Sequence, residues 1–235
     1  MINLSDRTVA EEARIKSAYA KRRSGFLYSW FHSGHLFLLQ GLEQRVLALL
    51  HKQGWHSLAD KKILEIGCGE GYWLRECIKW GAAPENITGV DLLPDRIAKA
   101  KKLCPQEVTI HCDNAENLAF DDGSFDLVFQ FTVFTSIFDF RMKKLMAQEM
   151  LRVSREDSLI IWYDFYMNNP LNPDVRGIRK HEIAELFPHR RIELHRVTLA
   201  PPLARLLAPF SWLTCYVLER SRLFNTHYLG VIRKV

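Results

Sequence analysis

The stretch ILEIGCGEGYW, residues 63–73, decides the fold. Its first four residues are mostly apolar, as in a short buried strand. Three glycines follow at alternate positions: Gly67, Gly69 and Gly71. Glycine lets a backbone pass close to a ligand, because a side chain would block the approach. Residues 72–81 then place apolar side chains at helical spacing and end in glycine, which is typical of a helix end. The stretch predicts a strand, a ligand-binding turn and a helix.

Outward from this turn, strand-like and helical segments alternate. The strand-like runs are KILEIG, ITGVDLL, VTIHCD, FDLVFQF and SLIIWYDF, and helices are predicted between them, including 94–103 and 140–153. Alternation of this kind is typical of βαβ units. We therefore predict an α/β fold with a mostly parallel sheet and helices on both faces.

The two ends of the chain differ from this middle part. Residues 1–57 are predicted to be helical, and we interpret them as an N-terminal extension or lid. Residues 58–235 are predicted to form a single domain, in which 166–220 carry insertions on the substrate side. Within them PPLARLLAPFSWLTCYVL, residues 201–218, is unusually apolar and predicts a helix or a broken helix.

Composition limits the class of protein. The chain has 235 residues, of which 48% are hydrophobic, so it can bury a sizeable core. Its five cysteines form no CxxC or Cys/His pattern, so we predict no metal site and no disulfide framework. The first residues lack the apolar core of a signal peptide, and the expected location is cytoplasmic. A net charge of +5 suits an acidic partner but is also ordinary for a soluble enzyme, and no basic tract indicates nucleic acid.

The glycine turn fits one of two nucleotide-binding patterns. The dinucleotide fingerprint G-x-G-x-x-G requires a third glycine where this chain has Tyr72 or Leu74, so a nicotinamide enzyme is the least favoured reading. The pattern present is E-x-G-x-G-x-G, beginning at Glu65. It resembles the first motif of class I S-adenosylmethionine-dependent methyltransferases, and the resemblance is close over residues 61–165.

This resemblance implies a Rossmann-like, doubly wound sheet of seven strands and S-adenosyl-L-methionine as cofactor. In the family the glycine turn lies against the methionine part of the cofactor, and an acidic residue stands where Glu65 does. The cofactor-binding residues implied by this motif are Glu65, Gly67, Cys68, Gly69 and Gly71.

Asp91 follows Gly71 by 20 residues, at the predicted tip of the second strand. A carboxylate there can accept hydrogen bonds from both ribose hydroxyls, and Leu92 would face the adenine. The alternative is a role at the start of the next helix, which opens with Pro94.

Residues 112–120, CDNAENLAF, resemble the family segment G-D-A-x-x-L-P-F, which binds adenine. The match on Ala115 places Asn114 where the family usually has Asp, and Asp113 at the Gly. An Asn oxygen can accept the same hydrogen bond without charge, so the choice between Asp113 and Asn114 stays open.

Gln130 and Phe131 end the strand FDLVFQF, where open α/β sheets bind ligands, so both are predicted to line the cofactor pocket. Asp126, early in the same strand, is predicted to be structural. Further on, SRED (154–157) replaces the Pro-Gly-Gly turn of the family, and we expect this to change the shape of a loop.

The acceptor side is less distinct. His32 or Asp164 is predicted to be the general base, if the acceptor carries a proton; the alternative for His32 is a surface or capping role. Tyr28, Asn168, Asn169 and Arg176 are predicted to contact the substrate, although the last three could instead brace their loop, 168–177. The aromatic candidates for a lid are Tyr19, Tyr28, Trp30 and Phe31.

The predicted function is methyl transfer from S-adenosylmethionine to a small molecule. A softer resemblance, based on QFTVF, WYDF and NNPLNPDVRG, implies O-methylation of a sugar or glycan. The alternatives are a nucleic-acid or protein methyltransferase and a non-catalytic S-adenosylmethionine-binding module. Segment 201–218 is expected to cover the substrate or form a dimer contact; the third possibility is docking on the inner membrane face.

Overall fold

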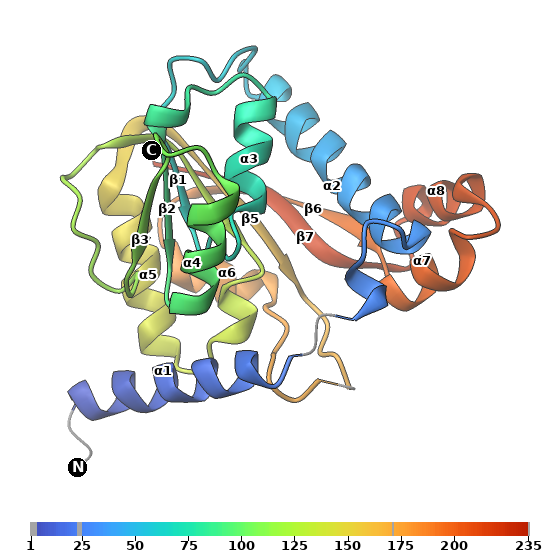
Figure 1. Ribbon diagram of the computed structural model, residues 1–235, viewed down its shortest axis with the longest axis horizontal. Coiled ribbons are helices and arrows are strands. Elements are labelled where there is room, and N and C mark those ends of the chain that lie inside the picture. The colour runs from blue at the N-terminus through green and yellow to red at the C-terminus, as the bar shows by residue number, and fades with distance from the viewer. Residues whose placement is uncertain (1–3, 23–24, 171, 235) are drawn as a thin grey trace.

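The computed structural model describes residues 4–22, 25–170 and 172–234; the first three residues of the predicted extension and position 171 of the predicted substrate loop lie outside this range. Seven strands form one sheet in the order β3-β2-β1-β4-β5-β7-β6 (Figure 1). The strands are β1 (Ile63–Ile66), β2 (Ile87–Asp91), β3 (Thr109–Cys112), β4 (Phe125–Phe131), β5 (Ser154–Phe165), β6 (Arg191–Leu199) and β7 (Asn225–Arg233). Neighbouring strands are parallel except around β7, which is antiparallel to β5 and to β6. The predicted fold class is confirmed.

Helices cover both faces of the sheet. They are α1 (Leu4–Ala20), α2 (Ser33–Lys52), α3 (Tyr72–Lys79), α4 (Pro94–Leu103), α5 (Phe140–Val153), α6 (Lys180–Leu186), α7 (Pro201–Leu207) and α8 (Trp212–Ser221), with single 3-10 turns η1 (Phe26–Tyr28), η2 (Pro84–Asn86) and η3 (Phe134–Ser136). The helices α2, α3 and α4 share one apolar cluster with the sheet, whereas α5 and α6 share the other. The sheet is therefore buried on both sides, which explains why its central strands are almost wholly apolar.

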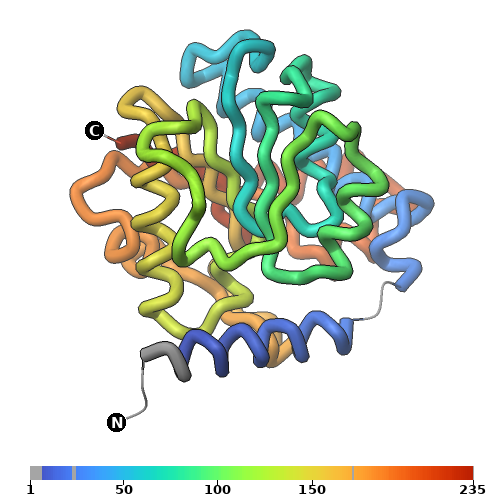
Figure 2. Tube along the Cα trace, turned by 60° about the vertical axis from the view of Figure 1, so that its left-hand side comes forward, coloured from blue at the N-terminus to red at the C-terminus, as the bar shows by residue number. Residues whose placement is uncertain are grey.

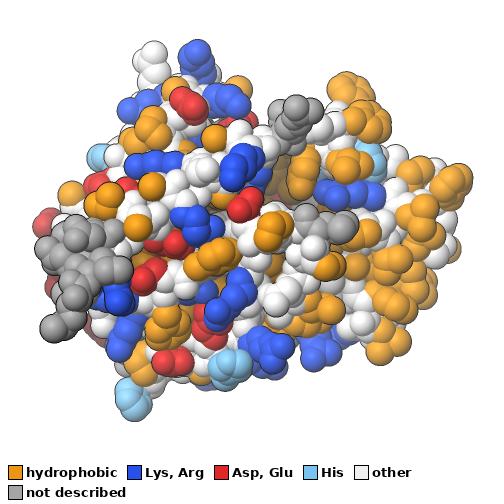
Figure 3. All heavy atoms as spheres, turned by 90° about the horizontal axis from the view of Figure 1, so that it is seen from below, with side chains coloured by type: hydrophobic (Ala, Val, Ile, Leu, Met, Phe, Trp, Pro, Cys, Tyr) orange, Lys and Arg blue, Asp and Glu red, His pale blue; other side chains and the backbone are white. Residues whose placement is uncertain are grey.

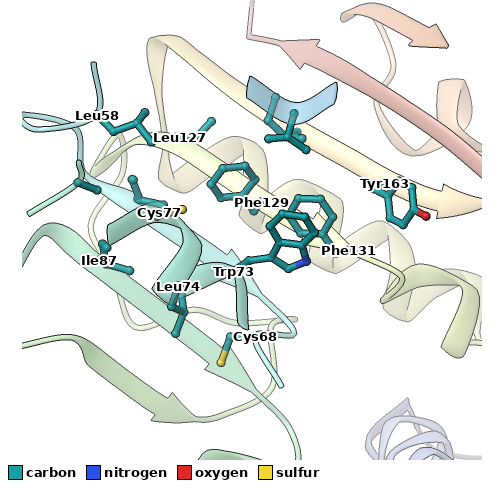
Figure 4. Packing of buried hydrophobic residues seen from close by; sticks show 14 of the residues in the cluster. Leu58, Cys68, Trp73, Leu74, Cys77, Ile87, Leu127, Phe129, Phe131 and Tyr163 are labelled. Atoms are coloured by element: carbon teal, nitrogen blue, oxygen red, sulfur yellow. The ribbon is translucent and has the colours of Figure 1, made fainter. Parts of the chain in front are cut away.

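Side chains alternate between the two clusters along each central strand. In β4, Leu127, Phe129 and Phe131 belong to the cluster under α3, and Val128 faces the other way. Phe131 stacks on Trp73 of α3, with ring centroids 4.2 Å apart and planes 15° from parallel (Figure 4). This stack fixes the helix that follows the glycine turn against the end of β4.

Helix α1 lies apart from the layers beside the sheet. Figures 1 and 2 show it running across the molecule beyond the ends of the strands, next to the start of α5. Glu11 accepts hydrogen bonds from the backbone N–H groups of Phe138 and Asp139, and Tyr19 Oη lies 3.1 Å from Ser136 Oγ. Polar contacts from both halves of α1 thus attach it to the segment between β4 and α5.

One expectation about a loop needs revision. SRED forms no loop, because β5 begins at Ser154 directly after α5; its register against β4 shifts between Phe125 and Leu127 instead. An ion pair attaches this start of β5 to β4, because the Arg155 guanidinium lies 2.5 Å from the Asp126 carboxylate. The predicted structural role of Asp126 is thereby confirmed. The apolar segment 201–218 is a broken helix, α7 and α8, as one of the two alternatives predicted.

Within the described parts of the chain, no helix combines the length and apolar character needed to cross a bilayer.

Candidate functional site

A pocket of about 100 Å³, partly open to solvent, lies where β1, β2 and β4 end and α1 crosses them. Seven predicted cofactor residues line it: Gly67, Asp91, Leu92, Asp113, Asn114, Ala115 and Phe131. Helix α1 contributes Ile15 and Tyr19 from the opposite side. The pocket has the position typical of ligand sites in open α/β sheets.

The glycine turn lies very close to the loop that follows β4. Gly67 has a φ of +70°, and a Cβ atom added to it would lie 2.4 Å from Val133 Cγ2. The Gly67 and Cys68 N–H groups both donate to the Val90 carbonyl, at 2.7 and 3.0 Å, which fixes the turn to β2. Only glycine meets both the backbone angle and the space at position 67.

Asp91 joins the two loops on either side of it. Its Oδ2 accepts a hydrogen bond from Gly69 N at 2.9 Å, and its Oδ1 accepts one from Leu93 N at 2.9 Å. Its side chain is not the cap of α4, because the N-cap residue of that helix is Leu93. Each carboxylate oxygen has a second lone pair, so Asp91 can still accept hydrogen bonds from two hydroxyls of a ligand.

Asp113 and Asn114 have different environments. Asn114 Nδ2 donates to Glu12 Oε1 of α1 at 2.8 Å and to Glu116 at 2.9 Å, while its Oδ1 accepts from Glu116 N. Asp113 is exposed, and its Oδ1 accepts from Asn114 N at 2.7 Å. The Asn114 side chain is therefore occupied by α1 and its own loop.

The other predicted cofactor residues lie behind the lining: Glu65, Cys68, Gly69, Gly71 and Gln130. Glu65 is buried, and its Oε2 has no hydrogen-bond partner among the residues that the structure describes. Burial, and secondly the nearby Asp91 charge, raise the pKa of Glu65 well above its usual value. Burial likewise raises the pKa of the Cys68 thiol, so this cysteine is not a reactive thiolate.

Gln130 does not line the pocket but stabilises the segments around it. Its Nε2 donates to the Tyr163 carbonyl at 3.3 Å and its Oε1 accepts from Val133 N at 3.2 Å. The amide thus connects the ends of β4 and β5 to the loop that faces the glycine turn.

Neither predicted general base lines the pocket. His32 caps α2, because its Nδ1 accepts hydrogen bonds from Gly34 N at 3.1 Å and His35 N at 3.4 Å. Asp164 is 1% exposed, and Thr135 Oγ1 donates to its Oδ1 at 2.5 Å. Burial raises the pKa of Asp164 to about 7, against the opposing effect of the Thr135 hydrogen bond. For His32 the structure matches the capping alternative.

Nor do the predicted substrate residues line it. Asn168 Oδ1 accepts from Gly177 N at 3.0 Å, the Asn169 carbonyl accepts from Asn172 N, and Arg176 lies 3.5 Å from Glu182. These contacts match the alternative in which 168–177 brace their own loop.

The aromatic lid candidates separate into two groups. Tyr28, Trp30 and Phe31 are exposed away from the pocket, and the Arg205 guanidinium lies 5.1 Å from the Tyr28 ring centroid. Tyr19 alone among the four lines the pocket.

Several lining residues escaped prediction. Arg96 of α4 lies over the Tyr19 ring at 4.7 Å, and Met142 and Met146 come from the pocket side of α5. The spacing of the two methionines by four residues was the available signal. Thr132, with a φ of +57°, gives no sequence signal, because a left-handed threonine is rare.

Among the described residues, no group of three His, Cys, Asp or Glu side chains is arranged to hold a metal ion.

Part of this chain is similar to a known protein family. Residues 63–157 match the model of a family described as methyltransferase domain. A curated relative from Synechocystis, named 2-methyl-6-phytyl-1,4-hydroquinone methyltransferase, is 32% identical over 117 residues, which are 47% of this chain and 35% of that protein. The chain spans less than half the length of the curated relatives it matches.

Solved structures extend the likeness to nearly the whole chain. The PH0226 protein from Pyrococcus horikoshii OT3 has a TM-score of 0.63 at 18% identity, covering 93% of this chain and 98% of its own. The 1,6-didemethyltoxoflavin-N1-methyltransferase of Burkholderia thailandensis, solved with 1,6-didemethyltoxoflavin and S-adenosylhomocysteine, has a TM-score of 0.62 at 16% identity, covering 99% and 90%. At these identities the likeness shows the fold.

Proposed function

We propose that this chain, whose residues 63–157 match the model of a methyltransferase domain, is a class I S-adenosylmethionine-dependent methyltransferase that transfers a methyl group to a small molecule bound beneath α1. The observation that carries the proposal is the joint position of Gly67, Asp91 and residues 113–115 around one pocket.

The residues present fit S-adenosylmethionine. The cofactor supplies a methyl group on a positively charged sulfur, so it needs no further activation by the protein. Asp91 would accept hydrogen bonds from the ribose hydroxyls, while Leu92 and Ala115 supply apolar faces for the adenine. Gly67 lines the pocket, where its backbone would lie against the methionine part of the cofactor. The chain's remaining task is to hold the acceptor in line with the methyl group.

For the adenine amino group we propose Asp113 as the acceptor. Both residues line the pocket, but Asn114 Nδ2 donates to Glu12 and its Oδ1 already accepts from Glu116 N, whereas Asp113 is exposed and offers two carboxylate oxygens. A carboxylate accepts from an amino group more strongly than a neutral amide does. Asn114 would instead connect the adenine loop to α1 through Glu12.

The pocket favours an acceptor with an apolar body. Besides polar lining residues such as Arg96, Thr132 and Ser136, it has a group of apolar ones: Ile15, Ile137, Met142 and Met146. Such a lining suits a ring or chain system more than a polyhydroxylated one. The hydroquinone named for the Synechocystis relative belongs to that class. A sugar or glycan acceptor is the second candidate, but the amides and guanidinium of 168–177 that favoured it in the sequence do not line the pocket.

His32 and Asp164 stay predictions as general bases. Asp164 is the stronger of the two, because a pKa of about 7 suits proton transfer near neutral pH. Its contact to Thr135 would have to open for it to reach an acceptor. Full turnover by both His32→Ala and Asp164→Asn would exclude both residues.

Calorimetry with S-adenosylmethionine, S-adenosylhomocysteine and NAD tests the cofactor. We expect the two sulfur compounds to bind and Asp91→Ala to abolish binding, while the neighbouring exposed Asp95→Ala serves as control. Binding of NAD alone would overturn the proposal. A methyl-transfer screen over hydroquinones, phenols and sugars then separates an enzyme from a binding module and chooses between the acceptor classes.

A further inference from the structure

An exposed apolar surface covers α7, α8 and the turn after α8, at the end of the molecule formed by β6 and β7 (Figures 1 and 3). This α7–α8 surface is defined by six side chains that are between 49% and 85% exposed: Leu206, Phe210, Leu213, Tyr216, Val217 and Leu223. The 3-10 turn η1 adjoins it, since Arg205 lies over the Tyr28 ring. So many large apolar side chains together are unusual on the surface of a monomer and indicate a partner.

Helix α8 is apolar on its outer side. Leu213 and Val217, one turn apart, are 72% and 59% exposed, whereas Cys215 and Glu219 face inward and are buried. An ordinary surface helix presents polar side chains to water and apolar ones to the core. Here the carboxylate is the buried group: Glu219 accepts from Thr198 N at 2.9 Å and pairs with Arg45 at 3.2 Å.

The charges around the surface have one sign. From residue 194 to the end of the chain Glu219 is the single acidic residue, and the stretch 13–42, which includes η1, has none. Arg220 and Arg222 are exposed beside the apolar side chains, and Arg205 is half-buried there. The surface therefore joins exposed apolar groups to a positive border.

Two other occupants fit less well. None of the pocket-lining residues comes from 200–224, so the expectation that 201–218 cover the substrate is not met in this structure. A symmetric dimer through this surface would bring the arginine border against itself or leave it unpaired, because an isologous contact repeats the same groups on both sides.

We propose that the α7–α8 surface docks on a membrane whose lipids carry negative charge. Its apolar side chains would enter the boundary between headgroups and acyl chains, while Arg220 and Arg222 lie among the anionic headgroups. Docking of this kind needs no spanning helix. It goes beyond the proposed methyl transfer and does not depend on it.

Vesicle flotation of the full chain tests the proposal. The vesicles are phosphatidylcholine alone or with about one third phosphatidylglycerol, whose surface attracts basic residues. We expect binding to the anionic vesicles, weaker binding at high salt, and at least about a tenfold loss of partitioning for Leu213→Gln with Val217→Gln. Arg220→Glu with Arg222→Asn should lose the preference for anionic vesicles; Asn suits the left-handed backbone at 222.

The matched control is Leu103→Gln, which alters an exposed leucine at the end of α4 and should bind vesicles as the native chain does. Circular dichroism checks that each variant folds, and calorimetry with S-adenosylhomocysteine reports on the proposed function separately. Absence of native binding to anionic vesicles, or undiminished binding by the Leu213/Val217 variant, overturns the proposal. A dimer in analytical ultracentrifugation that this variant abolishes, without vesicle binding, would assign the surface to a second copy.

Discussion

At Gly67 two constraints act on one residue, and each can be tested. An added Cβ would lie 2.4 Å from Val133 Cγ2, and the φ of +70° is unfavourable for any other residue. We expect Gly67→Ala to weaken S-adenosylhomocysteine binding by about a hundredfold or more, since the turn must move by a sizeable fraction of an ångström to relieve the contact. Isothermal titration calorimetry measures this.

The control for Gly67 is the pair Gly67→Ala with Val133→Ala, which removes the close contact but keeps the backbone angle. We expect partial recovery of binding, because one of the two constraints is lifted. Unchanged affinity in Gly67→Ala alone would show that the turn does not approach the ligand.

Asp164 gives a prediction about pH. Its pKa rises from 3.8 to about 7 on folding because of burial, so the folded state keeps a proton that the unfolded state releases. The contribution of Asp164 to stability must then fall as pH rises between these two values and stay constant above the upper one. Asp164→Asn has no such proton. The stability of the native chain relative to this variant should fall by up to about 4 kcal/mol between about pH 4 and pH 7.

Urea unfolding of both proteins at several pH values across this interval measures the difference. A difference that stays flat, or rises with pH, would contradict a raised pKa for Asp164. Thr135→Val removes the hydroxyl that donates to the carboxylate, and it should raise the pKa of Asp164 further.

Single residues could be predicted from the sequence where chemistry restricts the residue type. Gly67 and Asp91 are such cases, because a close approach requires glycine and a diol requires a carboxylate. The choice between Asp113 and Asn114 could not be predicted, since it depends on Glu12, which lies 102 residues from Asn114 and meets it only after folding. The role of His32 could not be predicted either, because an imidazole nitrogen that accepts a hydrogen bond can serve a helix cap as well as a general base.

At the scale of elements, helix α1 is attached by few contacts that can be removed one at a time. Glu11 is the main one, since it accepts from two N–H groups just before α5 and pairs with Arg14 at 2.8 Å. Burial raises the pKa of Glu11, but the Arg14 and backbone hydrogen bonds outweigh it and the net pKa is lowered. The carboxylate is therefore charged at neutral pH.

We expect Glu11→Ala to speed hydrogen exchange in α1 by about tenfold to a hundredfold, because two N–H groups and one guanidinium lose their partner. Exchange in β4 should stay unchanged. Val9→Ala, at an exposed position on the same helix, is the control and should leave α1 as it is. Equal exchange in all three proteins would mean that other contacts hold α1.

Secondary-structure elements could be predicted where apolar residues recur at helical spacing over a long segment. The limits predicted for 94–103 and 140–153 are those of α4 and α5. The SRED segment was misread because a local pattern suggested a loop, whereas Arg155 and Asp126 form their ion pair across two strands that are distant in sequence. The separation of α7 from α8 follows from Ser211, whose Oγ accepts from Thr214 N at 3.1 Å and begins a new helix.

At the scale of the whole molecule, the pocket and the α7–α8 surface are attached to different parts of the fold. The pocket lies at the ends of β1, β2 and β4 under α1, whereas α7 and α8 pack with α2 and β6. Ligand binding should therefore stabilise one end of the molecule more than the other. Hydrogen exchange with and without S-adenosylhomocysteine measures both ends in one experiment.

We expect α1 and the turn at 67–71 to exchange more slowly when the ligand is present, because Ile15 and Tyr19 would close on it. At a ligand concentration about a hundredfold above Kd, opening that requires ligand release becomes roughly 2.7 kcal/mol less favourable, about a hundredfold in exchange. Helix α8 lines no part of the pocket, so its exchange should change only to the extent that it opens by global unfolding. If the ligand slowed exchange in α8 as much as in α1, the two ends would unfold as one cooperative unit. If the ligand did not slow exchange in α1, this helix would not cover the pocket.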